Sequence, residues 1–303
     1  MKSAITAVVL AAPGTNRDVD VAHALTLAGA QVRIVSLAEV NAASLADARM
    51  AVVAGGFSFA DALGSGRLFA LELTQRLGDS LAGFVGAGRP VLGICNGFQT
   101  LVRAGILPGT NPITDSSPGD RALGGVLPAS DPISAATPGG TSRADIGPAT
   151  PEGTSRADIG PVALGHNAHG RFECRWVTLE AETASTCIWT AGIVEPIICP
   201  IAHGEGRFHG HPDTIAALAR NGQIALRYRR ADGSDAHGDF PFNPNGSDDD
   251  IAGICDPTGV VLGLMPHPED HVLARQHPRW TRGERAGSCQ PLFANGVRHA
   301  KEL

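Results

Sequence analysis

An apolar segment, a tight turn and the start of a helix follow one another in the stretch Arg89-Pro90-Val91-Leu92-Gly93-Ile94-Cys95-Asn96-Gly97-Phe98-Gln99. Cys95 has a glycine two residues before it and another two residues after it, the spacing of a nucleophile elbow. Such a turn lifts the side chain above the sheet, and the glycines leave room for neighbouring backbone. The amide that follows Cys95 would lie at a helix N-terminus, where it can donate to a developing oxyanion. The stretch therefore predicts Cys95 as the nucleophile of an α/β enzyme.

Strand and helix patterns alternate on the N-terminal side of this stretch. Apolar runs predict strands at 4–12, 31–37, 50–54 and 90–94, and helical spacing predicts helices near 21–28, 67–78 and 97–104. Further strand-like segments follow at 171–179, 197–202, 223–228, 251–255 and 260–265. The alternation predicts an α/β three-layer sandwich with a mostly parallel central sheet and helices on both faces. Functional groups gather at the carboxyl ends of such strands, where Gly55, Gly56 and Cys95 fall.

Composition narrows the classes of function. The 303 residues are 43% hydrophobic, which is enough for a large core. The formal net charge of −6 does not indicate a basic surface for binding nucleic acid. The apolar segment 4–12 is too short to cross a membrane and lacks the features of a signal peptide. The six cysteines show no metal-binding spacing, as expected for reduced thiols in the cytoplasm. Lys2 and Lys301 are the only lysines, so we expect any ATP chemistry to occur on another chain.

The region 109–161 differs from the rest because it is rich in proline, glycine, serine and threonine. The eight residues from Thr141 to Pro148 recur from Thr154 to Pro161. Two copies with almost no apolar face cannot form a solenoid. We expect one domain over 1–303 that carries a mobile, repeat-containing insertion at 130–161. A lid over a functional site is the alternative for this insertion.

Met265-Pro266-His267-Pro268-Glu269 supplies a base and a carboxylate that can orient it. His267 directly follows a predicted strand, and its rival as base is His203, which also follows an apolar run. His203, Glu205, His209 and His211 together suggest a metal site, but their spacing matches no strong zinc pattern and they occupy a predicted glycine-rich loop. We therefore expect no metal in this chain. The amide of Asn96 and one from Gly55-Gly56-Phe57 are the candidate oxyanion donors.

Four segments, Gly55-Gly56-Phe57-Ser58-Phe59-Ala60-Asp61, Gly93-Ile94-Cys95-Asn96-Gly97-Phe98-Gln99, His203-Gly204-Glu205-Gly206 and Met265-Pro266-His267-Pro268-Glu269, carry a resemblance. In order and spacing they resemble class I glutamine amidotransferases, which have a flavodoxin-like architecture. The Gly-Gly-Phe-Ser, Asn-Gly-Phe-Gln and His-Gly-Glu-Gly parts of these segments, with Ala12-Pro13-Gly14-Thr15-Asn16, narrow the likeness to the glutaminase subunits of phosphoribosylformylglycinamidine synthase, from purine biosynthesis. The tail segment Gln276-His277-Pro278-Arg279-Trp280 resembles longer members of that family.

The resemblance implies roles for individual residues. Cys95, His267 and Glu269 would form the triad, and the amides of Phe57 and Asn96 would form the oxyanion hole. Residues near the substrate L-glutamine would be Gly55, Gly56, Gln99 and His203. Ammonia would pass to a separate synthetase subunit that uses ATP and magnesium, and the complex would include a small accessory subunit in some cases. This chain would need no cofactor.

The chain departs from the family pattern at several positions. Arg17 stands where many relatives have a cysteine, a change expected to matter little. Ala60 replaces a glycine, and Leu63-Gly64-Ser65-Gly66 replaces the bacterial-type Leu-Arg-x-Gly, which puts the partner contacts in question. Three alternatives stay open: a glutaminase for a different acceptor, a catalytically silent regulatory subunit, and a peptidase-type cysteine hydrolase whose base lies elsewhere.

Overall fold

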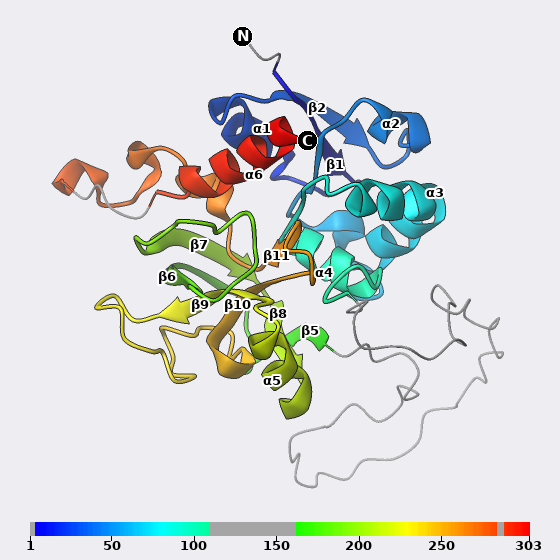
Figure 1. Cartoon of the computed structure of the whole chain (residues 1–303). Helices are drawn as coiled ribbons and strands as arrows, with labels where there is room; N and C mark the ends of the chain where they lie inside the picture. Colours follow the sequence, from blue (N-terminus) through cyan, green and yellow to red (C-terminus); the bar gives the residue numbers. More distant parts are fainter. Residues whose placement is uncertain (1–3, 110–161, 284–287) are drawn as a thin grey trace, which may run out of the picture. The chain divides into compact units, whose positions relative to one another are not determined.

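The computed structural model describes residues 4–109, 162–283 and 288–303 (Figure 1). The predicted insertion at 130–161, with its repeat, lies outside these residues. The strands are β1 (Thr6–Ala11), β2 (Gln31–Ser36), β3 (Met50–Val53), β4 (Val91–Ile94), β5 (Val162–His166), β6 (Glu173–Ala181), β7 (Ile197–His203), β8 (Glu205–Gly210), β9 (Ile224–Arg229), β10 (Ile251–Cys255) and β11 (Val261–Leu264). The α-helices are α1 (Asp18–Leu27), α2 (Ala42–Ala46), α3 (Arg67–Gly86), α4 (Asn96–Arg103), α5 (Pro212–Arg220) and α6 (Gln290–Glu302).

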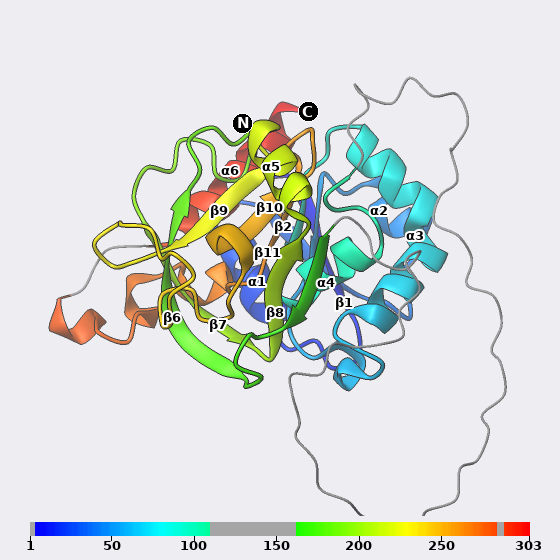
Figure 2. The ribbon, with the colours of Figure 1, turned by 90° about the horizontal axis from the view of Figure 1, so that it is seen from below.

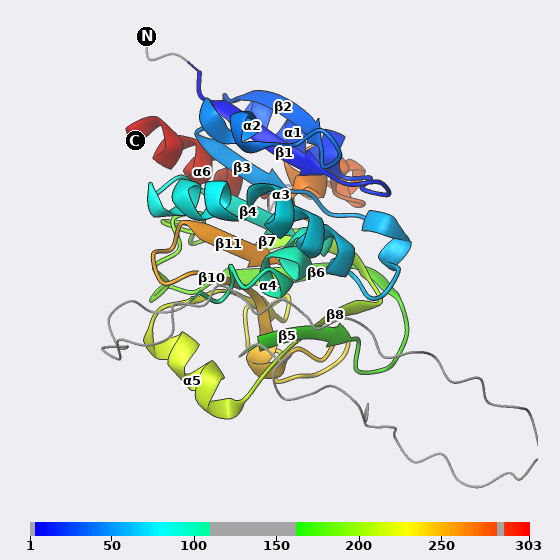
Figure 3. The same cartoon turned by 90° about the vertical axis from the view of Figure 1, so that its right-hand side faces the viewer.

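Nine strands form the main sheet in the order β2-β1-β3-β4-β11-β10-β9-β6-β7, and Figure 3 labels the first six of them one below another. The first five are parallel to one another. The residues of β3, β4 and β11 are buried throughout, as expected for strands covered on both faces. The α/β prediction and its parallel core are therefore confirmed.

The other four strands of the sheet run antiparallel to their neighbours, so the sheet is mixed. They correspond to four of the strand-like segments in the second half of the sequence. β10 and β11 are neighbours in the sequence and pair as a hairpin, which joins the antiparallel part to the parallel core. As a result the end of β11, which leads into His267, lies next to the end of β4, which leads into Cys95.

Helices cover both faces of the parallel strands, as the three-layer prediction requires. α1 and α6 pack together on one face, whereas α2, α3 and α4 are neighbours on the other (Figures 1 and 3). No helix of the described residues is both long and apolar enough to span a membrane.

A separate two-stranded sheet pairs β5 with β8. The expectation of a glycine-rich loop around His203 is wrong, because His203 ends β7 and Glu205 begins β8 after a single intervening glycine. Figure 2 shows β5 and β8 beside α4, the helix that follows Cys95. The small sheet therefore forms a wall next to the predicted nucleophile.

Candidate active site

Cys95 occupies the turn between β4 and α4 in a strained conformation, with φ 51° and ψ −107°. Its two flanking glycines are needed for close packing. A Cβ on Gly97 would lie 2.0 Å from the carbonyl oxygen of Val53, and one on Gly93 would lie 2.8 Å from the carbonyl oxygen of Gly97. The backbone thus has the geometry of an elbow, held against the neighbouring strand.

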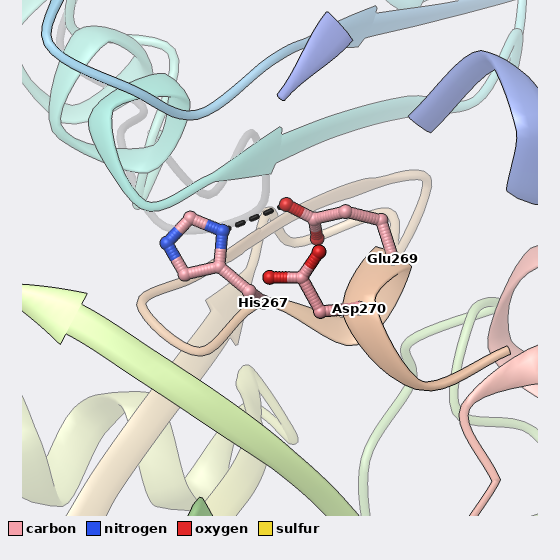
Figure 4. A group of neighbouring side chains, drawn as sticks. All are labelled: His267, Glu269 and Asp270. Carbon is pink, nitrogen blue, oxygen red and sulfur yellow. Dashed lines mark hydrogen bonds and ion pairs between the residues drawn. The ribbon is translucent and has the colours of Figure 1, made fainter. Parts of the chain in front are cut away.

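His267 lies beside Cys95, at the end of the adjacent strand. Its Nδ1 is 2.7 Å from Oε1 of Glu269, and both side chains are almost completely buried (Figure 4). A Cβ built on Gly55 would lie 2.9 Å from Cε1 of His267 and 3.4 Å from Cβ of Cys95. A side chain at position 55 would therefore meet both the base and the nucleophile. Burial alone would lower the pKa of His267, but the Glu269 carboxylate and Cys95 raise it well above its ordinary value.

A second carboxylate, that of Asp270, lies next to Glu269 (Figure 4). Ligand atoms of His267, Glu269 and Asp270 all lie within 4.8 Å of one another. Arg17, at the start of α1, reaches Asp270 with Nη1 3.4 Å from Oδ1. Arg17 therefore places a guanidinium beside Asp270, the neighbour of the carboxylate that orients His267.

Cys95 lines a cavity of about 280 Å³, large enough for an amino acid. Its other walls come from the segment after β3, from α4, from 166–172 and from the β7–β8 connection. Phe57 and Phe172 stack with ring centroids 6.2 Å apart and are both about half exposed, so they mark its mouth. Phe172 was not anticipated because nothing in its local sequence distinguishes it.

The amide of Phe57, predicted to serve the oxyanion, donates in this conformation to the carbonyl of Gly14 at 3.1 Å. Asn96, by contrast, begins α4, where its backbone amide has no partner within the helix. The Asn96 side chain is held by Asp61, whose Oδ1 accepts from Nδ2 at 3.0 Å, and by the hydroxyl of Ser58.

Gln99 lines the same cavity, but its side chain is already engaged within the protein. Its Nε2 donates to the carbonyl of Glu205, and its Oε1 accepts from Nδ2 of Asn96 at 3.2 Å. In this conformation Gln99 ties the nucleophile helix to the start of β8.

His203 also lines the cavity and is 4% exposed. Nδ2 of Asn167 donates to the carbonyls of Arg171 and His203, so Oδ1 of Asn167 faces Nδ1 of His203, 3.0 Å away. Nδ1 of His203 must then carry its proton. Burial, with a contribution from His267, lowers the pKa of His203 to about 3. The rival base thus lacks a carboxylate partner and stays neutral.

The four residues of the metal alternative are not brought together. Nδ1 of His209 is 2.7 Å from Oδ2 of Asp248, and His211 faces Asp213 at the start of α5. Among the described residues, the one convergent group of potential ligands is His267, Glu269 and Asp270, the same group that flanks Cys95.

A larger cavity, of about 560 Å³, is lined by polar residues around 227–229 and 235–250. Its two arginines are each paired with carboxylates, Arg227 with Glu182 and Asp249 and Arg229 with Glu180 and Asp235. Its one hydroxyl, that of Ser247, donates to Oδ1 of Asn245 at 2.7 Å, and no thiol lines it, so the smaller cavity is the candidate active site.

Comparisons with known proteins point to one family. The model of the CobB/CobQ-like glutamine amidotransferase domain matches residues 4–119 and 144–300. The phosphoribosylformylglycinamidine synthase subunit PurQ of Treponema denticola is 43% identical over 97% of this chain and 98% of its own length. The same-named subunit of Dehalococcoides mccartyi is 34% identical over 99% of this chain and all of its own. The structure of PurLQS from Thermotoga maritima matches with a TM-score of 0.64 and 26% identity, and covers 98% of this chain and 99% of that one.

Proposed function

This chain belongs to the family of PurQ subunits of phosphoribosylformylglycinamidine synthase, and from that premise we propose that Cys95, His267 and Glu269 are the triad with which it hydrolyses L-glutamine. It is a glutamine amidotransferase of purine biosynthesis. The arrangement at Gly55 carries the residue assignment, because only a glycine lets His267 and Cys95 approach each other there.

The chemistry follows from the positions of the side chains. The Cys95 thiolate attacks the carboxamide carbon of glutamine, and the tetrahedral intermediate collapses to a thioester as ammonia leaves. His267 takes the thiol proton and delivers it to the leaving nitrogen, and Glu269 stabilises the imidazolium that forms in between. Water, deprotonated by the same imidazole, then hydrolyses the thioester to glutamate and restores the thiol.

The oxyanion needs two donors in this scheme. We assign the first to the backbone amide of Asn96, at the N-terminus of α4. Gly56 lines the cavity, and its amide makes no backbone hydrogen bond within the described part of the chain, which supports it as the second in place of Phe57. We propose that Gln99 and His203 shape the glutamine site. Gln99 does so through its hydrogen bond to the Glu205 carbonyl, and His203 lines the cavity as an uncharged imidazole.

The relative of known structure is an assembly named PurLQS, and this chain works in the same way with a synthetase subunit PurL and a small subunit PurS. We propose that the ammonia passes to the synthetase, and that ATP and magnesium act there rather than on this chain. The near absence of lysine supports this division. All six cysteines lie in the described part of the chain and none forms a disulfide, which supports a cytoplasmic location.

The test is ammonia release from L-glutamine by the assembled complex. Cys95→Ala should reduce the rate by roughly 1,000-fold or more, because the nucleophile is lost. His267→Ala should have a comparable effect, whereas a peptidase-type site with its base elsewhere would stay active. Cys174→Ala is the matched control, since that cysteine is exposed and does not line the cavity. Full activity in Cys95→Ala would refute the assignment.

A further inference from the structure

Glu205 is a partly buried carboxylate in the wall of the cavity that Cys95 lines. Its Oε2 accepts from the backbone N–H of Ser65 at 3.3 Å, and its side chain is 23% exposed. The nearest basic side chain is His166, 3.7 Å from Oε1 and 82% exposed. In the described part of the chain no lysine or arginine forms an ion pair with Glu205. A carboxylate so placed is incompletely compensated.

A second acid reinforces this end of the cavity. Asp61 also lines it, and burial together with the charge of Glu205 raises the pKa of Asp61 above its ordinary value. Arg103 approaches from α4, but its Nε donates to the carbonyl of Ser65 at 2.8 Å. The charge of Arg103 interacts with that of Glu205 but forms no ion pair with it in the described part of the chain, so two carboxylates line this part of the cavity and favour a cation there.

The separation between this wall and the nucleophile suits one substrate. Nε2 of Gln99 donates to the Glu205 carbonyl, and Gln99 lies one turn along α4 from Cys95. A helical turn advances about 5.4 Å. In L-glutamine the carboxamide carbon and Cα are three bonds of about 1.5 Å apart. Because Cys95 and Glu205 line the same cavity, a glutamine with its carboxamide at Cys95 keeps its α-ammonium group within the cavity that Glu205 lines.

We propose that the carboxylate of Glu205, with Asp61 beside it, binds the α-ammonium group of L-glutamine and so selects an amino acid over other primary amides. This inference rests on the glutaminase function proposed above. It assigns Glu205 a binding role: the side chain fixes where the substrate lies along the cavity, while the triad does the chemistry. The main-chain carbonyl of the same residue anchors Gln99, which couples the substrate wall to the nucleophile helix.

The experiment compares L-glutamine with glutaramate, the analogue that lacks only the α-amino group, in the complex with the synthetase. Ammonia release is measured as kcat and KM for the native chain and for Glu205→Gln. For L-glutamine we expect KM to rise roughly 10- to 100-fold with kcat little changed, because a charge-assisted hydrogen bond is lost. For glutaramate the substitution should leave kcat/KM within about twofold. Glu182→Gln is the control, because that carboxylate is 28% exposed and lies outside the cavity.

Two further variants keep the result interpretable. Glu205→Asp retains the charge and should recover part of the preference for L-glutamine, and Asp61→Asn should reduce that preference severalfold. Equal losses for both substrates in Glu205→Gln would mean that Glu205 only supports the structure, and would overturn the proposal, as would an unchanged preference. Activity that does not depend on Cys95 would instead overturn the proposed triad, so the two failures are distinguishable.

Discussion

Two carboxylates and one guanidinium surround the buried base. Glu269 holds Nδ1 of His267, Asp270 lies beside it, and Arg17 reaches Asp270 from α1, a segment more than 250 residues away in the sequence. Like charges at this distance repel, so one of the acids is driven towards its neutral form. Burial, and then Glu269, raises the pKa of Asp270 to about 6, while Arg17 opposes the shift.

This shift predicts a pH-dependent cost in stability. Between the unfolded value of 3.8 and the folded value of about 6, the folded protein holds a proton that the unfolded chain has released. Stability therefore falls as the pH rises through this window and stays lower above it. Asp270→Asn removes the effect, so its stability relative to the native chain should increase by about 1 kcal/mol from about pH 4 to about pH 7, after allowance for solvent screening.

The measurement is urea unfolding across that range. The free energy of unfolding of Asp270→Asn at any one pH also reflects its lost ion pair with Arg17. The test is therefore how the difference in stability between variant and native chain changes with pH. Asp213→Asn, at a side chain that is 94% exposed, should show no such trend. A stability difference between Asp270→Asn and the native chain that stays constant with pH would contradict the assignment.

Single residues of the site were predictable where local sequence constrains the backbone. Cys95 and His267 each follow an apolar strand, so their positions at neighbouring strand ends could be inferred. The environments of Arg17, Asp270 and Asn167 could not, because their partners are distant in the sequence. The hydrogen bond of the Phe57 amide was not predictable for a similar reason: its acceptor, Gly14, comes from the loop after β1.

Among the elements, the nine strands of the main sheet are predictable to within a few residues of their ends, whereas β5 has no predicted counterpart and β8 falls in a predicted loop. β8 alternates as a strand should, with Gly206, Phe208 and Gly210 buried, but two of these three residues are glycines with no apolar side chain to reveal the pattern. Gly206 cannot be larger, because a Cβ there would lie 2.3 Å from the His203 ring. The close packing of Gly206 against His203 therefore requires a glycine at a position where an apolar side chain would have indicated a strand.

The contact between α4 and β3 predicts that the elbow tolerates no side chain at Gly97. In Gly97→Ala the new Cβ would lie 2.0 Å from the carbonyl oxygen of Val53, so either α4 or β3 must move. We expect a loss of about 3 kcal/mol in the free energy of unfolding, together with loss of glutaminase activity. Urea unfolding and ammonia release are the two measurements.

Gly83→Ala is the control for this variant. Gly83 lies inside α3, and a Cβ there meets nothing within 4 Å. The substitution should leave activity unchanged and stabilise the protein by up to about 1 kcal/mol, because alanine favours the helix. If Gly97→Ala were as stable and active as Gly83→Ala, the close approach of α4 to β3 would not be a constraint.

At the scale of the whole molecule, the chain forms the site of ammonia release but leaves its mouth uncovered. Phe57, Leu63 and Phe172 are exposed, and Phe57 and Phe172 flank the cavity entrance. In this state the N–H of Phe57 donates to the carbonyl of Gly14, so within this segment the Gly56 amide, but not the Phe57 amide, is available to an oxyanion. A partner that covers this rim would bury apolar surface and could shift the segment.

We therefore predict that the synthetase raises kcat/KM for ammonia release at least tenfold, most strongly with its ATP and ribonucleotide present. The assay compares the chain alone with the assembled complex. In the complex, Cys95→Ala should abolish glutamine-dependent synthesis but retain synthesis from added ammonium salt, which shows that the partner is intact. Turnover of glutamine that is indifferent to the synthetase would contradict the coupling while leaving the triad unaffected, because the Cys95 dependence is measured separately. The activation by the synthetase thus depends on the exposed residues at the cavity entrance, Phe57 and Phe172, whereas the hydrolysis itself depends on the buried triad.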